Sequence, residues 1–152
     1  MTRIEHSVTI QAPVEQVFSY AADFHKWPEW FEGVSEFTAT TPVTQGNGAR
    51  YSYKVSLMGV FVSVETEIRD FVQNRGWSGV ATRGMPHRTY WNFESLGRDT
   101  KLTYALEYQL PVPLLGPLLD VMLMRPQWNK ILQHSLNNLR QHFLTQASGS
   151  AH

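Results

Sequence analysis

The chain of 152 residues contains no cysteine. This absence excludes disulfides, thiolate metal sites and cysteine nucleophiles, and it favours a reducing compartment. Charge is also scarce, because only 17% of the residues are charged and 13 basic side chains balance 13 acidic ones. A protein that binds nucleic acid by neutralising phosphates needs a basic excess, so we expect no nucleic-acid partner.

Long apolar runs are missing as well. The most apolar stretch, residues 110–124, is shorter than the ~20 residues that span a bilayer. It is also interrupted by Pro111, Pro113 and Pro117. The first residues lack the apolar core of a signal peptide. We therefore expect a soluble, cytoplasmic protein with no integral membrane association.

Motifs for metals, nucleotides and serine hydrolysis do not occur. The chain has no His-Glu-x-x-His, and no pair of histidines lies near a carboxylate at ligand spacing. The glycine-rich motifs Gly-x-Gly-x-x-Gly and Gly-x-x-x-x-Gly-Lys-Ser/Thr are absent, as is Gly-x-Ser-x-Gly. We predict no metal and no cofactor.

Apolar and aromatic residues, by contrast, are abundant, at 42% and 12% of the chain. Such a composition excludes an intrinsically disordered chain. The length fits one domain over residues 1–152. We expect order from about residue 3 to about residue 145, followed by a small polar tail over 146–152.

The first part of the chain predicts a strand and two short helices. Apolar and polar residues alternate over residues 3–10, as in a half-buried strand. Pro13 suits the first turn of a helix, and apolar residues follow it at helical spacing. Pro28 restricts Trp27 to extended geometry, so the first helix cannot run through it. We expect a separate second helix over Pro28–Phe31.

Residues 34–110 predict six strands. Apolar and polar residues alternate with period two, in segments separated by short turns that contain glycine. Consecutive strands with short turns form an antiparallel meander with one apolar and one polar face. The expected turns are 45–48, 58–59, 74–76, 84–86 and 97–99.

The last part of the chain changes to helical spacing. Pro126 separates this segment from residues 117–124 or kinks it. A sheet with one apolar face and a single long helix bury both surfaces only if the sheet curls around the helix. We therefore predict an α+β protein, with a curved antiparallel sheet of about seven strands around a long C-terminal helix. The apolar stripe of that helix is Trp128, Ile131, Leu132, Leu136, Leu139 and Phe143.

Three stretches carry a resemblance to a known family. They are Val8–Phe18, Ala22–Trp30 with its Asp-x-x-x-Trp-Pro-x-Trp pattern, and Thr100–Tyr104 followed by Tyr108–Pro111. In this order they resemble the START/Bet v 1-like superfamily with its helix-grip fold, and within it the polyketide cyclase/dehydrase and lipid-transport group. The resemblance covers about residues 3–145. It implies a cavity between sheet and helix that takes an apolar small molecule.

The lining of such a cavity is expected from inward strand positions and the helix stripe. The alternative is that these side chains fill the space as a solid core, and for any single position that is the commoner outcome. As a set, they include several tyrosines whose hydroxyls need partners when buried, which favours a ligand pocket. The predicted ligand-binding residues are Tyr51, Tyr53, Val62, Val64, Trp91, Phe93, Tyr104, Leu106, Tyr108, Leu118, Met122, Trp128 and Leu132.

Catalytic candidates are few. His87 begins an inward-facing strand beside a turn, and Arg83 at a strand end either meets an anionic group or is solvated. His6 lies on an apolar strand face, where a satisfied core histidine is the expected role. Residues 117–124 form either the start of the long helix or an apolar lid; the helix is the favoured prediction.

Two functions follow from these patterns. The first is a carrier or sensor that binds a lipid, isoprenoid or polyketide-like molecule. The alternative is a cyclase, aromatase or dehydratase that works on a polyketide-like chain in the same cavity, and this needs a proton acceptor and an oxyanion donor. A protein-interaction role ranks third. The patterns predict no particular oligomeric state.

Overall fold

The order of elements is that predicted from the sequence. The structure is a computed structural model that describes residues 2–32, 37–42, 46–57, 60–109 and 125–150, with only the backbone described for 55–57, 60–62 and 147–150. A strand and two short helices come first, then six strands and a long helix. The elements are β1 (Thr2–Ile10), α1 (Val14–Ala21), the 3-10 helix η1 (Phe24–Glu29), β2 (Thr38–Ala39), β3 (Arg50–Leu57), β4 (Val60–Val72), β5 (Gly76–Arg83), β6 (His87–Leu96), β7 (Asp99–Tyr108) and α3 (Arg125–Ser150).

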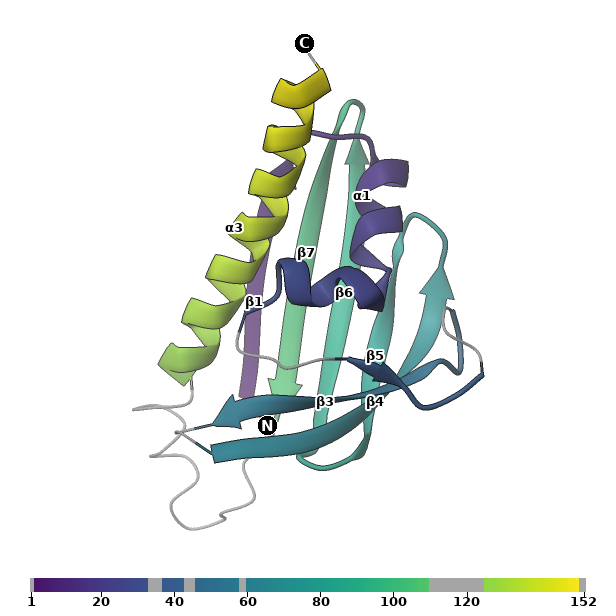
Figure 1. The fold of residues 1–152 in the computed structure, drawn as a ribbon, viewed down its shortest axis with the longest axis vertical. Coiled ribbons are helices and arrows are strands. Elements are labelled where there is room, and N and C mark those ends of the chain that lie inside the picture. The colour runs from purple at the N-terminus through teal and green to yellow at the C-terminus, as the bar shows by residue number, and fades with distance from the viewer. Residues whose placement is uncertain (1, 33–36, 43–45, 58–59, 110–124, 151–152) are drawn as a thin grey trace.

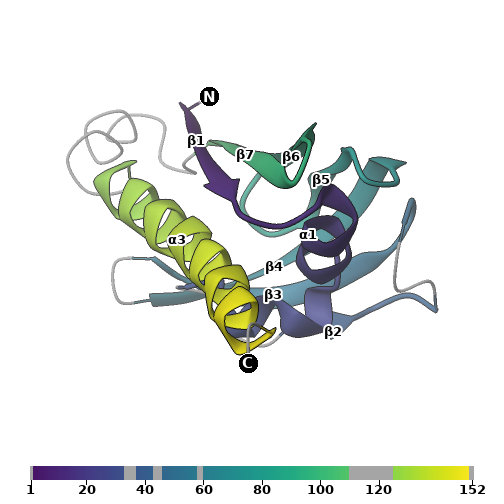
Figure 2. The same ribbon diagram turned by 90° about the horizontal axis from the view of Figure 1, so that it is seen from above.

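The seven strands form one antiparallel sheet in the order β1-β7-β6-β5-β4-β3-β2. The first strand pairs with the last, so the sheet is a meander with β1 added to its end. Its register shifts twice between β4 and β5, at Glu65/Thr66 and at Arg69/Val72. Such irregularities bend a strand and increase its twist. The sheet curls, and α3 lies in its concave side (Figures 1 and 2).

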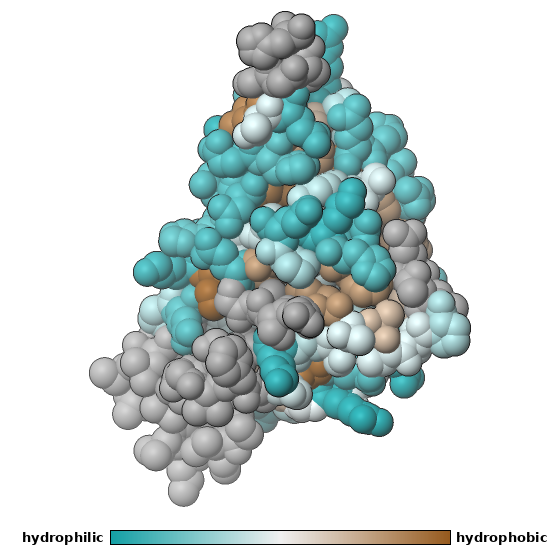
Figure 3. Space-filling view, viewed as in Figure 1, coloured by the Kyte–Doolittle hydropathy of each residue, from teal (hydrophilic) through white to brown (hydrophobic). Residues whose placement is uncertain are grey.

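Helix α3 packs against the sheet by the predicted stripe. Its residues Trp128, Leu132, Leu136, Leu139 and Phe143 are buried. Hydrophilic side chains cover the outer side of the helix in the space-filling view (Figure 3). This separation of faces is what an amphipathic helix needs in order to bury one side against a sheet. The α+β helix-grip architecture is confirmed.

The first strand also behaves as predicted. Ile4 and Ile10 are buried, while Arg3, Glu5, Ser7 and Thr9 between and beside them are exposed on the other face. His6 is partly buried, and its Nε2 lies 2.7 Å from the side-chain oxygen of Asn129 in α3. His6 was expected to be a satisfied core histidine; it has a hydrogen-bond partner as expected, but it is partly exposed and not part of the core.

The second short helix begins four residues earlier than predicted and contains Pro28. It starts directly after its N-cap residue Asp23, whose carboxylate accepts a hydrogen bond from the backbone N–H of His25 at 3.1 Å. The Trp27 indole is buried and donates a hydrogen bond to the Ala21 carbonyl at 2.5 Å. The cap and the burial of this ring outweigh the extended preference that Pro28 imposes on its predecessor.

The long helix differs from the prediction at its C-terminal end. It begins at Arg125, so Pro126 lies in its first turn, where the missing N–H costs no hydrogen bond. It continues to Ser150, whereas the polar composition predicts a tail from Gln146. Glutamine and alanine are good helix formers, so the backbone ladder extends beyond the apolar stripe. The helix-or-lid prediction for residues 117–124 lies outside the described residues.

Candidate functional site

Strand β6 runs from a solid core into a cavity. Its inward side chains, in order along the strand, are His87, Thr89, Trp91 and Phe93, and all four are buried. At one end, Phe93 packs edge-on against Phe18 of α1, with ring centroids 5.1 Å apart. At the other end, His87 and Thr89 line a cavity, and Trp91 lies between the two regions.

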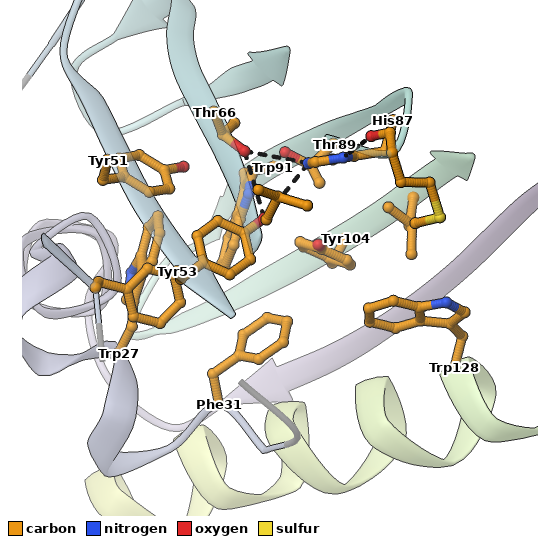
Figure 4. Close-up of a pocket in the computed structure, with 14 residues that line it drawn as sticks. Trp27, Phe31, Tyr51, Tyr53, Thr66, His87, Thr89, Trp91, Tyr104 and Trp128 are labelled. Carbon is orange, nitrogen blue, oxygen red and sulfur yellow. Dashed lines mark hydrogen bonds between the residues drawn. The ribbon is translucent and has the colours of Figure 1, made fainter. Parts of the chain in front are cut away.

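The cavity has a volume of about 40 Å³ and lies between the sheet, η1 and α3 (Figure 4). Such a volume holds a few water molecules. A lipid-sized molecule therefore fits only if lining side chains move. Among the described lining residues, Phe31, Phe37, Tyr53 and Met85 are only partly buried, and they mark the side where the cavity meets solvent.

The structure brings together eight of the residues singled out from the sequence. The strand alternation had placed most of them on the inner face, and the helix stripe supplied one. These lining residues are Tyr51, Tyr53, Val64, His87, Trp91, Tyr104, Leu106 and Trp128.

Four other residues of the prediction lie elsewhere. Phe93, Tyr108 and Leu132 are buried in the core and do not line the cavity. Arg83 is exposed at the end of β5, opposite Glu65 of β4. Hydrogen bonds from Thr82 and Thr40 lower the pKa of that carboxyl most, and the charge of Arg83 adds a smaller effect. The two catalytic candidates, His87 and Arg83, are therefore not brought to one site. The side chains of Val62, Leu118 and Met122 lie outside the described residues.

Six lining residues were not predicted. Trp27 and Phe31 come from the aromatic turn around η1. The concentration of large rings in this short stretch of sequence is the feature that could have identified them. Thr66 and Thr89 occupy inward positions of the strand alternation. They were not predicted as lining residues because only apolar and aromatic side chains were chosen at those positions. Phe37 and Met85 belong to connecting segments, where no periodicity exists to place them. The six are Trp27, Phe31, Phe37, Thr66, Met85 and Thr89.

A short chain of hydrogen bonds forms the polar part of the cavity (Figure 4). His87 Nδ1 lies 2.8 Å from the backbone oxygen of Met85, and its Nε2 lies 3.1 Å from Thr66 Oγ1. The Tyr53 hydroxyl lies 3.4 Å from both Thr66 Oγ1 and His87 Nε2. Burial lowers the pKa of His87. It also raises the pKa of Tyr53 to about 12, so both groups stay uncharged near neutral pH.

Two further tyrosines face the cavity. Tyr51 and Tyr104 are 3% and 4% exposed, and burial raises the pKa of each well above its ordinary value. The hydroxyl of Tyr53 acts electrostatically on both, which brings three phenol groups from β3 and β7 into one neighbourhood. No hydrogen bond to the Tyr51 or Tyr104 hydroxyl is formed by the part of the chain that the structure describes.

A glycine makes room for the two threonines. Gly79 of β5 pairs with Thr89 of β6 and lies beside Thr66. A Cβ atom at Gly79 would lie 2.5 Å from Thr89 Oγ1 and 2.9 Å from Thr66 Cγ2. Both distances are shorter than van der Waals contact, so a larger residue at this position would displace the cavity wall.

The described lining carries no formal charge. No Asp, Glu, Lys or Arg is among the described residues around the cavity. Within the described ranges, no group of three His, Asp or Glu side chains is placed to hold a metal ion. No helix among these residues is long and apolar enough to cross a membrane. The site can therefore bury the apolar surface of a small molecule and form a few hydrogen bonds from uncharged groups.

Several solved structures share this fold. One is TTHA0849 from Thermus thermophilus, with a TM-score of 0.82, 20% identity, and coverage of 95% of this chain and 99% of that one. Another is a START superfamily protein from Mycobacterium smegmatis, with a TM-score of 0.74, 18% identity, and coverage of 95% and 98%. The Bet v 1-like protein Ara h 8.0201 matches with a TM-score of 0.69, 12% identity, and coverage of 95% and 98%.

The fold is thus the helix-grip fold of the START and Bet v 1-like proteins. The family model described as "Polyketide cyclase / dehydrase and lipid transport" matches residues 1–143, and the chain belongs to this family. The resemblance seen in the sequence is confirmed. Among curated proteins, none matches the sequence.

Proposed function

We propose that this protein binds an apolar small molecule, such as a lipid, isoprenoid or polyketide-like compound, between the sheet and α3, as a carrier or sensor. The observation that carries the proposal is the composition of the cavity wall. Aromatic and aliphatic side chains dominate it, and the few polar groups are neutral. Ligand pockets typically combine an apolar wall with a small number of placed polar groups.

The energetics of such binding need only burial and shape. Each 100 Å² of apolar ligand surface removed from water contributes about 2.5 kcal/mol. Part of this is offset, because a cavity of about 40 Å³ must widen to admit a ligand. Phe31, Phe37 and Met85 are only partly buried, so moving them toward solvent exposes less apolar surface than moving the fully buried lining residues.

The proposal is tested by extraction. The protein is purified from its native source or from a rich extract, denatured, and the released small molecules are identified by mass spectrometry. We expect about one apolar molecule per protein chain in the wild type and none in Leu106→Trp, which fills the cavity with a larger ring. An equal yield from both proteins would contradict binding at this site.

A second function is favoured by the state of His87. Its lowered pKa and its hydrogen bond to the Met85 carbonyl leave an unprotonated Nε2 facing Thr66 and Tyr53. Such a nitrogen is a candidate proton acceptor for a cyclase or dehydratase that abstracts a proton beside a carbonyl. Turnover of a ketone substrate that His87→Asn abolishes and that levels off above the pKa of His87 would support an enzyme. Turnover that is unchanged in His87→Asn would exclude this mechanism.

A further inference from the structure

We infer that the cavity selects an uncharged ligand that carries a hydrogen-bond acceptor, such as a ketone or ester carbonyl oxygen, held by the hydroxyls of Tyr51 and Tyr104. This inference rests on the proposed function and adds the chemical class of the ligand. It follows from the hydrogen-bond donors and acceptors on the cavity wall.

The His87 ring fixes the direction of the hydrogen-bond chain. The Met85 carbonyl only accepts hydrogen bonds, so the nitrogen that faces it at 2.8 Å, Nδ1, carries the proton. In the neutral ring, Nε2 then accepts a hydrogen bond, and Thr66 donates one at 3.1 Å. The Tyr53 hydroxyl lies 3.4 Å from both Thr66 Oγ1 and His87 Nε2, and it donates its proton to this pair. The protons of Tyr53, Thr66 and His87 are all used within this chain.

The donors that remain are the Tyr51, Tyr104 and Thr89 hydroxyls and the Trp128 indole N–H, and they are without partners among the described residues. Tyr51, Tyr104 and Trp128 line the cavity and are 3%, 4% and 6% exposed. The Trp128 indole nitrogen is buried with no hydrogen-bond partner in the described ranges. The Tyr51 and Tyr104 hydroxyls receive none from this part of the chain either. Figure 4 shows Tyr51 and Tyr104 entering the cavity from different strands, with Trp128 on the helix side.

The wall offers these donors no strong acceptor. Its described side chains include no carboxylate and no amide oxygen. Buried polar groups are almost always hydrogen-bonded in native proteins, so a ligand that displaces water from these hydroxyls must replace the hydrogen bonds that the water made. A carbonyl oxygen supplies two lone pairs and no donor of its own, so it matches unpaired O–H groups better than another hydroxyl does.

The charge of the ligand group decides between an anion, a cation and a neutral acceptor. A carboxylate also accepts hydrogen bonds, but no Lys or Arg among the described lining residues would neutralise it, and His87 is uncharged. Burial of an unpaired ion is costly. A cation would meet aromatic faces, which attract it, but it would leave the tyrosine donors unmatched. A neutral acceptor is the one class that satisfies both the charge and the hydrogen-bond count.

The experiment compares ligands of one shape. The probes are 2-acetylnaphthalene with a ketone, 2-ethylnaphthalene with no polar group, 2-naphthoate with a negative charge, and a trimethylammonium naphthalene with a positive charge. Dissociation constants are measured by quenching of tryptophan fluorescence. The variants are Tyr51→Phe and Tyr104→Phe, each of which removes one hydroxyl. Tyr108→Phe is the matched control, because Tyr108 is buried but does not line the cavity.

The decisive number is the ratio of the dissociation constants of the ethyl and acetyl compounds, because water solubility cancels when this ratio is compared between variants. We expect Tyr104→Phe, Tyr51→Phe or both to lower the ratio about tenfold, the weight of one buried hydrogen bond. Tyr108→Phe leaves it unchanged. Both charged probes bind more weakly than the ketone.

The inference is overturned if the ratio is the same in all four proteins, or if either charged probe binds as tightly as the ketone. In those cases 2-ethylnaphthalene still binds, so the proposed function stands without the added ligand class. If no naphthalene binds to the wild type at all, the proposed function fails together with the inference.

Discussion

The two ends of the inner sheet face share the same alternation of inward and outward side chains, but they differ in how closely the inward side chains pack. Under α1, the rings of Phe18, Trp77 and Phe93 pack directly against one another, with centroids 5.1 to 5.6 Å apart. Toward the start of α3, the inward strand positions carry Tyr51, Tyr53 and Tyr104, and a cavity remains. Rings that carry hydroxyls need partners for them, so they pack less simply than phenylalanine.

Strand β6 shows this change along its length. Phe93 belongs to the solid end, Trp91 stacks on Trp77 at 4.8 Å and on Trp27 at 5.7 Å, and His87 belongs to the cavity. Alternation alone decides which face a side chain is on. What lies opposite it decides whether it is core or cavity wall: α1 faces one end of the strand, and the beginning of α3 faces the other.

The largest expected effect concerns the solid end. Phe18→Ala removes a ring that is 1% exposed and touches three other aromatic rings. We expect a loss of about 3–5 kcal/mol in the free energy of unfolding, measured by urea denaturation. A loss below about 1 kcal/mol would contradict the close packing of this end.

Trp91→Ala tests the junction of the two regions. The ring stacks on Trp77 and Trp27 and meets Tyr104 edge-on at 4.6 Å. We expect a similar loss of stability together with weaker binding of an uncharged fluorescent probe. Glu67→Gln, on the outer face, is the control and leaves probe binding unchanged. Equal effects of the two substitutions on binding would refute the assignment of the faces.

Gly79→Ala is expected to act on the cavity wall with an intermediate effect. The added methyl collides with Thr89 and Thr66, so we expect a loss of about 1–3 kcal/mol in stability. Thermal denaturation measures this loss. The double variant Gly79→Ala/Thr89→Ala removes the closer collision and should recover part of it. If the double variant is no more stable than Gly79→Ala, the collision is not the cause.

The smallest effect is the pH dependence due to His87. Its pKa is 6.5 in the unfolded chain and lower in the folded protein because of burial. The unfolded chain therefore binds more protons between these two values, and stability decreases as the pH falls below 6.5 toward the folded-state pKa. The full contribution of the neutral imidazole is present above this range. The denaturation midpoint should fall as the pH is lowered through it.

The control for this prediction is His87→Asn, whose amide can still donate to the Met85 carbonyl but does not titrate. Its midpoint should change less with pH than that of the wild type. The carboxyls of Glu65 and Glu67 have lowered pKa values and lose their contributions as the pH falls below 4.5, but they do so alike in both proteins. The same pH slope in both proteins would show that the imidazole is not the responsible group.

Sequence periodicity predicted the faces of the strands and the long helix, because both repeat at fixed spacing. It therefore located Tyr51, Tyr53 and Tyr104. It did not separate Tyr104, which lines the cavity, from Tyr108 further along the same strand, because that distinction depends on contacts distant in sequence. The start of η1 was missed for a similar reason: the burial of Trp27 overrides the local rule for a residue before proline.

The most direct test of a ligand cavity is a titration with N-phenyl-1-naphthylamine, an uncharged fluorescent probe, followed by energy transfer from Trp27, Trp91 and Trp128 at the cavity wall. The compared proteins are the wild type, Leu106→Trp and Lys101→Trp. The last two add the same ring to β7, on its inner and its exposed side. The account predicts one saturable site in the wild type and Lys101→Trp, and none in Leu106→Trp. Binding that is equal in the three proteins would contradict it.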